Sequence, residues 1–439
     1  MVSTLNLRQA FGEQQRISSA MKAAIVILFC YIAYEGYAML CYGGTLSILM
    51  EQWSISPEQS GLLASCSLVG MFVGALVLTW LADRIGRKKG VLICMCLFGL
   101  GAFAMAFATD AMQIAVMRFL VGLGGGATTS CATALVSEYI PNKSKGFVLG
   151  LMGAGFMIGG VAANLLNLAL IPAFGWQGPY FFSIAPFVIL TPLVVAFVPE
   201  SPKFYLAKGE NAKLASVVNR LMPGADVDEQ TAFELESEKK AKVPVGKIFS
   251  DHRLISTIGI WVVFFVCQYL TYGINNWLPS LVAESGFDLT SGLVFLLLVN
   301  LGGFIGALLF SKLGDKIGLR KSICWTLGLT VACLVALMFA KGTIAVGCLV
   351  ALLGAGFFGA SQILFSYSTL YYPVDVRALG SGFAGAAGRI GGIVGPSILG
   401  VFYAMNLGSM GMYTVLAVPV VLALLCMIFV VKDKYGADV

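Results

Sequence analysis

Three ionisable side chains interrupt long apolar stretches of this 439-residue sequence. Glu35 lies in FCYIAYEGYAMLCYG, Arg118 opens RFLVGLGGG, and Arg389 lies in GRIGGIVGP. Charged groups are costly inside a membrane and usually mark a functional site there. A carboxylate can take up and release a proton, and a guanidinium can bind a carboxylate through paired hydrogen bonds. We therefore expect Arg118 and Arg389 to bind an organic anion and Glu35 to couple its binding to protons.

Polar and aromatic residues at helical spacing extend this expected site. Tyr31, Glu35 and Tyr42 recur at intervals that place them on one face of a helix. Two later stretches add similar side chains that we expect to line the same cavity: Gln268, Tyr272, Asn275, Asn276, Gln362 and Phe365. Such a cavity fits an aromatic or otherwise planar carboxylate. For each Tyr, Gln or Asn alone, a hydrogen bond between helices is an equally good explanation.

The composition indicates what must position these residues. The chain is 58% hydrophobic and 11% charged, far less charged than a soluble globular protein, so we expect an integral membrane protein. Twelve apolar runs are each long enough to cross a bilayer. They span residues 23–46, 61–81, 90–108, 112–136, 146–171 and 180–198, then 254–278, 291–310, 322–340, 343–368, 379–404 and 410–431. The expected fold is therefore all-α, with twelve transmembrane helices.

The runs belong to an internal repeat. GALVLTWLADRIGRKK begins at Gly74, and GALLFSKLGDKIGLRK begins 232 residues later at Gly306. Two related halves in a strongly apolar chain are typical of transporters that bind substrate between the halves. We expect two pseudo-symmetric six-helix bundles, residues 1–199 and 254–439, joined by a cytoplasmic linker with amphipathic helices, residues 200–253.

The three intramembrane charges depart from the repeat. At the 232-residue offset, Glu35 corresponds to Cys267, Arg118 to Val350 and Arg389 to Met157. Scaffold residues should repeat where the scaffold repeats. The departure is therefore what a binding site built onto a symmetric frame would show.

Basic residues indicate the orientation. Of the 28 Lys and Arg residues, all but three fall on the side of the N-terminus; Lys341 falls on the other side, and Arg118 and Arg389 fall within runs. Basic loops stay in the cytoplasm, so we expect both termini there and a multi-pass protein of the cell (inner) membrane. Because the basic residues lie in short separate loops, we expect a lipid bilayer and no nucleic acid as partner.

The repeated loop and several further motifs carry a family resemblance. LADRIGRKK resembles the signature loop of the major facilitator superfamily. The segments around Glu35, SEYIP, PESPKFY and YYPVDVRALGSG are similar to those of its aromatic acid:proton symporter family. The resemblance implies proton-coupled import of a small, benzoate-type organic acid by alternating access. The family usually has a second acidic residue where this chain has Ala38, so coupling would depend on Glu35 alone.

The signature loop also predicts a gate. Asp83 lies at the cytoplasmic end of the second run, where it could bind the positive end of the eleventh helix, and Asp315 could do the same for the fifth. We expect gating roles for these two carboxylates and for Arg84, Arg87 and Arg377. Such contacts would form in one state and part in the other.

Other classes of function are less favoured. The chain has no phosphate-binding loop, so a gradient rather than ATP would supply the energy, and we expect no cofactor, no metal and no catalytic residues. A membrane enzyme is therefore not expected, and the chain should act as a monomer. Two alternatives remain open: a facilitator of a neutral or cationic metabolite on the same fold, and a sensor built on a transporter scaffold.

Overall fold

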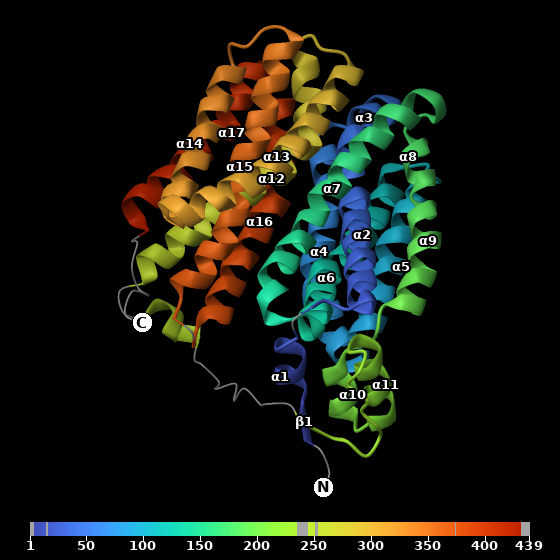
Figure 1. The fold of residues 1–439 in the computed structure, drawn as a ribbon. Helices are drawn as coiled ribbons and strands as arrows, with labels where there is room; N and C mark the ends of the chain where they lie inside the picture. The colour runs from blue at the N-terminus through green and yellow to red at the C-terminus, as the bar shows by residue number, and fades with distance from the viewer. Residues whose placement is uncertain (1–3, 15, 235–244, 251–252, 374, 432–439) are drawn as a thin grey trace.

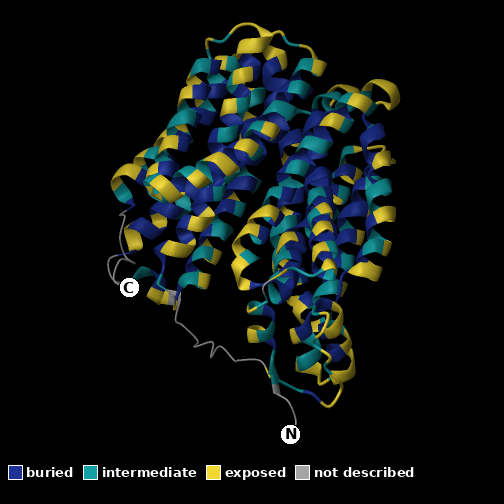
Figure 2. Cartoon of the chain, in the orientation of Figure 1, coloured by how far each residue is buried: buried dark blue, intermediate teal, exposed yellow. Residues whose placement is uncertain are grey.

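The protein is built almost entirely from long apolar helices (Figure 1). The structure, a computed structural model, describes residues 4–14, 16–234, 245–250, 253–373 and 375–431. Within these residues, twelve helical segments are long and apolar enough to cross a membrane, as the sequence predicts. Large apolar side chains such as Phe147, Ile344 and Phe429 point outward, and the interior between the helices is buried (Figure 2).

Each half of the chain contributes six of the spanning segments. The first half contains α2 (Ser19–Leu40) with the 3-10 turn η1 (Cys41–Gly44), α4 (Pro57–Ile85), α5 (Arg87–Met105), α6 (Ala111–Tyr139), α7 (Asn142–Phe174), and α8 (Gln177–Phe182) with α9 (Ile184–Phe197). The second half contains α12 (Leu254–Glu284), α13 (Leu289–Ile317), α14 (Leu319–Leu337), α15 (Thr343–Tyr371), α16 (Arg377–Ala404), and α17 (Gly408–Leu425) with η3 (Cys426–Val430). A short helix, α3 (Leu46–Trp53), follows η1.

Local sequence explains where several helices begin and turn. Ser56 and Gln59 form a capping box at the start of α4, and the Asp110 carboxylate accepts a 2.9 Å hydrogen bond from the backbone N–H of Gln113 at the start of α6. Gly86 and Gly318, the repeated glycines of the signature loop, have φ of 112° and 93°. A residue with a side chain rarely adopts such a φ, so glycine permits the tight turns from α4 to α5 and from α13 to α14.

Glycines also let helices within each bundle approach closely, and these contacts repeat. A Cβ atom added at Gly122 would lie 1.7 Å from the carbonyl oxygen of Ser67, and one at Gly354 would lie 2.0 Å from that of Val299. Both glycines and both carbonyls are related by the 232-residue offset. The packing of α6 on α4 therefore recurs as the packing of α15 on α13, and only glycine fits at these positions.

The two bundles meet at the ends away from the chain termini. We call the side of the molecule that carries Thr4 and Val431 the terminal side, and the opposite side the far side. The Ser65 hydroxyl of α4 donates a 2.6 Å hydrogen bond to the carbonyl oxygen of Ile393 in α16 and lies 2.8 Å from the Ser397 hydroxyl. Figure 1 shows the bundles diverging from there toward the terminal side. The far ends are thus packed together.

Short elements cover the terminal side of the first bundle. They are β1 (Thr4–Asn6), α1 (Leu7–Gly12), α10 (Pro202–Lys208), α11 (Asn211–Leu221) and β2 (Ala232–Glu234), and β1 pairs with β2 in parallel. One face of α11 is buried, and Arg220 donates a 2.8 Å hydrogen bond to the carbonyl oxygen of Ala196 in α9. The predicted bundle limits at residues 199 and 254 stay predictions.

The end of the linker contacts the second bundle. The turn η2 (Val245–Phe249) buries Ile248, and Lys247 forms an ion pair with Asp375, just before α16. The hydrogen bond from Lys247 lowers the pKa of Asp375. The linker therefore has one anchored end on each half of the chain.

Candidate functional site

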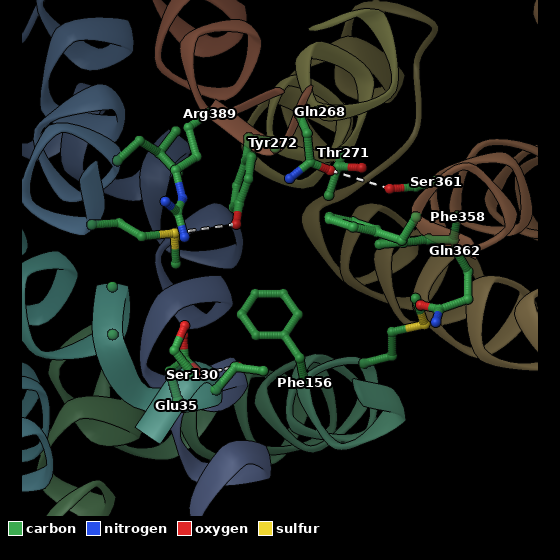
Figure 3. Close-up of a pocket in the computed structure, with 18 of the residues that line it drawn as sticks. Glu35, Ser130, Phe156, Gln268, Thr271, Tyr272, Phe358, Ser361, Gln362 and Arg389 are labelled. Atoms are coloured by element: carbon green, nitrogen blue, oxygen red, sulfur yellow. Dashed lines mark hydrogen bonds between the residues drawn. The ribbon is translucent and has the colours of Figure 1, made fainter. Parts of the chain in front are cut away.

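A cavity of about 460 Å³ lies between the two halves of the chain (Figure 3). Helices α2, α4, α6 and α7 line it from the first half, and α12, α15 and α16 line it from the second. Ser381 and Gly382, near the terminal-side end of α16, belong to the lining. On the far side, the packed ends of α4 and α16 close the cavity. The cavity therefore extends toward the terminal side.

Six of the predicted site residues line this cavity: Glu35, Gln268, Tyr272, Gln362, Phe365 and Arg389. They come from α2 of the first half and from α12, α15 and α16 of the second half. The fold thus brings together the predicted proton carrier, one predicted anion-binding arginine, and amide and aromatic side chains.

Glu35 is the carboxylate of the cavity. Its side chain is almost fully buried, and the Thr129 hydroxyl donates a 3.4 Å hydrogen bond to its Oε2 atom. Among the described residues, Glu35 has no ion-pair partner. Gly125 of α6 lies against it, and a Cβ atom there would be 3.2 Å from Glu35 Oε1. The small residue therefore makes room for the carboxylate beside α6.

Arg389 is the cation of the cavity. It projects from α16 beside the phenol of Tyr272 (Figure 3), and it is only partly buried. Gly388 next to it packs against α12 near Gln268, which brings the two helices close. Within the described part of the chain, the Arg389 guanidinium has no hydrogen bond or ion pair to the protein. A guanidinium held in a cavity in this way can bind an anion through two parallel hydrogen bonds.

Amides, hydroxyls and aromatic rings form the rest of the wall. The Ser361 hydroxyl donates a 3.4 Å hydrogen bond to Gln268 Oε1, and Gln362 lies on the same side of the cavity (Figure 3). In the same view the ring of Phe156 lies between Gln362 and the side of the cavity that carries Glu35 and Arg389, and Phe358 lies beside Ser361 and Gln362. The cavity therefore has a charged side, a neutral polar side and aromatic rings between them.

The sequence prediction missed several lining residues, among them Thr129, Ser130, Phe156, Thr271, Phe358 and Ser361. The repeat contains a signal for some of them. At the 232-residue offset, Thr129 corresponds to Ser361, Ser130 to Gln362, and Met157 to Arg389, and all six line the cavity. Carrying the candidate residues Gln362 and Arg389 to their counterparts in the other half would have found Ser130 and Met157.

Arg118 lies outside this cavity in the structure. It is 2% exposed, and it donates hydrogen bonds to the carbonyl oxygens of Leu63 at 3.0 Å and Ala64 at 2.9 Å and to the Ser67 hydroxyl at 2.7 Å. Its guanidinium carbon also lies 3.9 Å from the ring centroid of Tyr42. The protein itself thus supplies partners for Arg118, and the predicted role in substrate binding stays a prediction.

Three of the remaining predicted lining residues make hydrogen bonds within the protein. The Tyr31 hydroxyl donates to the Thr128 hydroxyl at 3.2 Å. Asn275 donates to the carbonyl oxygen of Thr271 at 2.7 Å and accepts a 2.8 Å hydrogen bond from Asn300, and Asn276 donates to the carbonyl oxygen of Tyr272 at 2.7 Å. None of these three residues, nor Tyr42, lines the cavity in this conformation.

Two predicted gating residues of the first half, Asp83 and Arg87, belong to a charge network on the terminal side. Arg87 forms an ion pair with Glu138 of α6 and lies 3.6 Å from Asp83. Glu138 also accepts a hydrogen bond from the Ser201 hydroxyl, and Glu200 accepts a 2.9 Å hydrogen bond from the backbone N–H of Lys88. The sequence prediction missed Glu138 and Glu200, although both lie in the motifs SEYIP and PESPKFY.

Two other predicted gating residues, Arg84 and Arg377, contact residues that are close to them in the sequence. Arg84 stacks its guanidinium 3.9 Å from the ring centroid of Trp80, and Asp315 is exposed. Arg377 lies 3.5 Å from the carbonyl oxygen of Tyr372. The hydrogen bonds between α4 and α16 in the described chain lie at residues 61–65 and 393–397, far from Asp83. The proposed contact of Asp83 with the start of α16 is thus absent among the described residues in this state, and its formation in another state stays a prediction.

Comparisons with known proteins agree with this arrangement. Residues 24–396 match the family model of the Major Facilitator Superfamily. The chain is 32% identical to the benzoate transport protein of Acinetobacter baylyi over 93% of its own length and 89% of the relative's. It is 30% identical to the gallate transporter of Pseudomonas putida, with 92% and 90% covered.

A solved structure of a D-xylose-proton symporter has the same fold. The TM-score is 0.76 at 16% sequence identity, and the alignment covers 96% of this chain and all of that one. Members of this superfamily are membrane transporters and not enzymes. The chain therefore belongs to the major facilitator superfamily and, within it, to the family of aromatic acid transporters.

Proposed function

We propose that this protein imports a small aromatic carboxylate together with protons, by alternating access across the cell membrane, as a monomer with both termini in the cytoplasm. The observation that supports this most directly is the placement of Arg389 and Glu35 in one cavity with aromatic rings. Relatives named for the transport of benzoate, gallate and 4-hydroxybenzoate support the substrate class.

The proposed substrate pose follows from the three parts of the cavity. The carboxylate of the substrate binds the Arg389 guanidinium, and its ring packs against Phe156 and Phe358. A hydroxyl opposite the carboxylate reaches Gln268 or Gln362, which can both donate and accept hydrogen bonds. The cavity volume of about 460 Å³ accommodates one such small acid.

The proposed proton coupling follows from the charges of the lining residues. Glu35 is the only carboxylate and Arg389 the only guanidinium that line the described cavity. With Glu35 ionised, these two charges already balance, so an anionic substrate would add an uncompensated negative charge. Protonation of Glu35 removes the negative charge of its carboxylate, so that Arg389 can balance the charge of the substrate. Substrate and proton therefore bind cooperatively. Ala38, where related carriers have an acid, leaves Glu35 as the single group for this role.

The proposed transport cycle starts from the state of the structure. The far ends of the bundles are packed and the cavity extends toward the terminal side, which corresponds to a carrier open to the cytoplasm in the proposed orientation. In the opposite state the far-side contact of Ser65 with α16 would part, and Asp83 would bind the start of α16. The network of Arg87 with Glu138 and Ser201 would then be rearranged.

The experiment that tests the proposal is uptake of a labelled hydroxybenzoate by proteoliposomes, with and without an imposed pH gradient. Wild-type protein should accumulate the acid only with the gradient. Glu35→Gln should still exchange labelled for unlabelled substrate but fail to accumulate it, because the amide mimics the protonated carboxyl and cannot release a proton.

Other outcomes would favour the alternatives. Wild-type uptake that is indifferent to the pH gradient, together with a silent Glu35→Gln, would overturn symport in favour of facilitated diffusion. Ligand binding without any uptake would indicate a sensor. A matched control is Thr133→Val, since Thr133 lies one helical turn from Thr129 on α6 but does not line the cavity.

A further inference from the structure

A second concave region lies on the outer surface of the protein, between α14 and α17. It encloses about 700 Å³ and shares no residue with the substrate cavity. Both helices belong to membrane-spanning segments, so the groove opens toward the bilayer. An occupant of this groove must therefore be compatible with lipid surroundings.

The groove has a basic end and an apolar length. Arg320 and Lys321, in the first turn of α14, lie at its terminal-side end, and Trp325, Leu329 and Leu424 line it deeper in the membrane. The lining continues along α14 to Ala332, which is about 16 Å from Lys321 at the rise of an α-helix. That length is about half the hydrocarbon thickness of a bilayer, so it matches the chains of one leaflet.

Three residues define the shape of the groove. Arg320 donates hydrogen bonds of 2.9 Å and 2.7 Å to the carbonyl oxygens of Met427 and Ile428, so its charge is fixed at η3, which follows α17. Gly328 leaves the floor of the groove open, because a Cβ atom added there would meet nothing within 4 Å. Trp325 is 69% exposed and forms a wall.

The first half of the chain provides an internal comparison. Lys88, the counterpart of Arg320 at the 232-residue offset, donates a 2.7 Å hydrogen bond to the carbonyl oxygen of Val195, the counterpart of Met427. There, however, Arg220 of the linker helix α11 binds the next carbonyl oxygen, that of Ala196. Cys96 stands in place of Gly328, and Ile93 in place of Trp325. The region of the first half that corresponds to the groove therefore has different side chains and an additional arginine from the linker.

We propose that the groove between α14 and α17 binds one anionic phospholipid from the leaflet on the terminal side. Its phosphate contacts Lys321 near the fixed charge of Arg320, and one acyl chain lies along Trp325, Gly328 and Leu329. Charge complementarity selects an anionic headgroup, because basic side chains at the membrane surface attract anionic lipids. The apolar length selects a lipid over a free phosphate.

Quenching of Trp325 fluorescence by brominated lipid tests this proposal. The full chain is reconstituted in phosphatidylcholine vesicles that contain either dibrominated phosphatidylglycerol or dibrominated phosphatidylcholine. The Trp325 signal is the part lost in Trp325→Phe, and Trp80, 55% exposed on α4, reports on ordinary surrounding lipid through Trp80→Phe. Dibrominated phosphatidylglycerol should quench Trp325 at about fivefold lower content than dibrominated phosphatidylcholine does. The two lipids should quench Trp80 equally.

Matched variants locate the site. Lys321→Gln should remove the preference for phosphatidylglycerol, whereas Lys89→Gln, at the corresponding position of the first half, should leave it unchanged. Gly328→Leu should reduce quenching of Trp325 by both lipids, since its side chain fills the groove, and Cys96→Leu should not. The open space at Gly328 makes this variant compatible with folding.

Three results would overturn the proposal. Equal quenching of Trp325 by the two lipids would show ordinary surrounding lipid. Loss of the preference on addition of inorganic phosphate would assign the basic end to a free anion. Quenching that appears only after deletion of residues 432–439 would show that the end of the chain occupies the groove.

Discussion

Arg118 and Arg389 both lie in membrane-spanning helices, yet their surroundings differ. Around Arg118, two carbonyl oxygens and a hydroxyl of α4 accept hydrogen bonds from the guanidinium, and the Tyr42 ring covers it. Around Arg389, the described chain offers an open cavity with Tyr272 beside it. Arg118 thus has its partners within the protein, whereas Arg389 faces the cavity that we propose binds the substrate.

The largest effect on binding is expected at Arg389. Arg389→Ala should weaken binding of an aromatic carboxylate by about 2 kcal/mol or more, roughly 30-fold, because the substrate charge loses its partner. Titration calorimetry on the purified protein measures this loss. The thermal midpoint should stay close to that of the wild type, and Arg389→Lys should recover part of the affinity. Unchanged affinity in Arg389→Ala would remove the arginine from the site.

Arg118 should show the reverse pattern. Arg118→Met should lower the free energy of unfolding by about 1–3 kcal/mol, because buried hydrogen bonds to carbonyl oxygens are lost. Thermal unfolding in detergent reports this, with Ser67→Ala as a milder control that removes one of the hydrogen bonds to Arg118. A variant that unfolds normally but no longer binds substrate would instead place Arg118 in the binding site.

The neutral polar side of the cavity should contribute to selectivity. Gln362→Leu should weaken binding of a hydroxybenzoate by about 1 kcal/mol, roughly fivefold, and leave binding of benzoate nearly unchanged, since only the hydroxyl loses a partner. Competition between the two acids measures the ratio directly. Equal losses of affinity for both acids would show that Gln362 contributes to the shape of the cavity and does not bind the hydroxyl of the substrate.

The smallest effect is expected at the exposed ion pair of Lys247 with Asp375. The pKa of Asp375 is lowered, so its contribution to stability is present above the ordinary Asp value of about 4 and is lost as the pH falls through the lower folded value. Asp375→Asn should therefore differ slightly from the wild type in thermal midpoint at neutral pH and match it in strong acid. A difference that grows in acid would contradict this pairing.

The fold was largely predictable because its signals are local or repeated. Apolar length identified the spanning helices, and the offset of 232 residues identified the two halves. The faces of the helices were harder to predict. Tyr42 was assigned to the face of Glu35 by helical spacing, but α2 passes into a 3-10 turn at Cys41, where that spacing no longer applies.

Part of the site depends on packing that no single stretch of sequence encodes. The backbone of Gly43 packs closely on α12 at Asn275, since a Cβ atom at Gly43 would be 1.9 Å from the Asn275 carbonyl oxygen. This close approach closes the far end and keeps Asn275 out of the cavity in this state. Arg118 likewise lies outside the cavity in this state, because α4 presents carbonyl oxygens to it. In both cases the position of the residue depends on the neighbouring helix.

The close glycine contacts have a consequence for how this chain tolerates mutation. Gly159 lies against the carbonyl oxygen of Ala33, and its counterpart Gly391 lies against that of Phe265, each with room for no side chain. A map of fitness over all substitutions should therefore show mirrored intolerance at such paired positions in the two halves. Glu35 and Arg389 should not tolerate loss of their charge, whereas Cys267 and Met157, their counterparts, should accept other uncharged side chains of similar size. Differences between the two halves of such a map would separate the transport site from its frame without knowledge of the substrate.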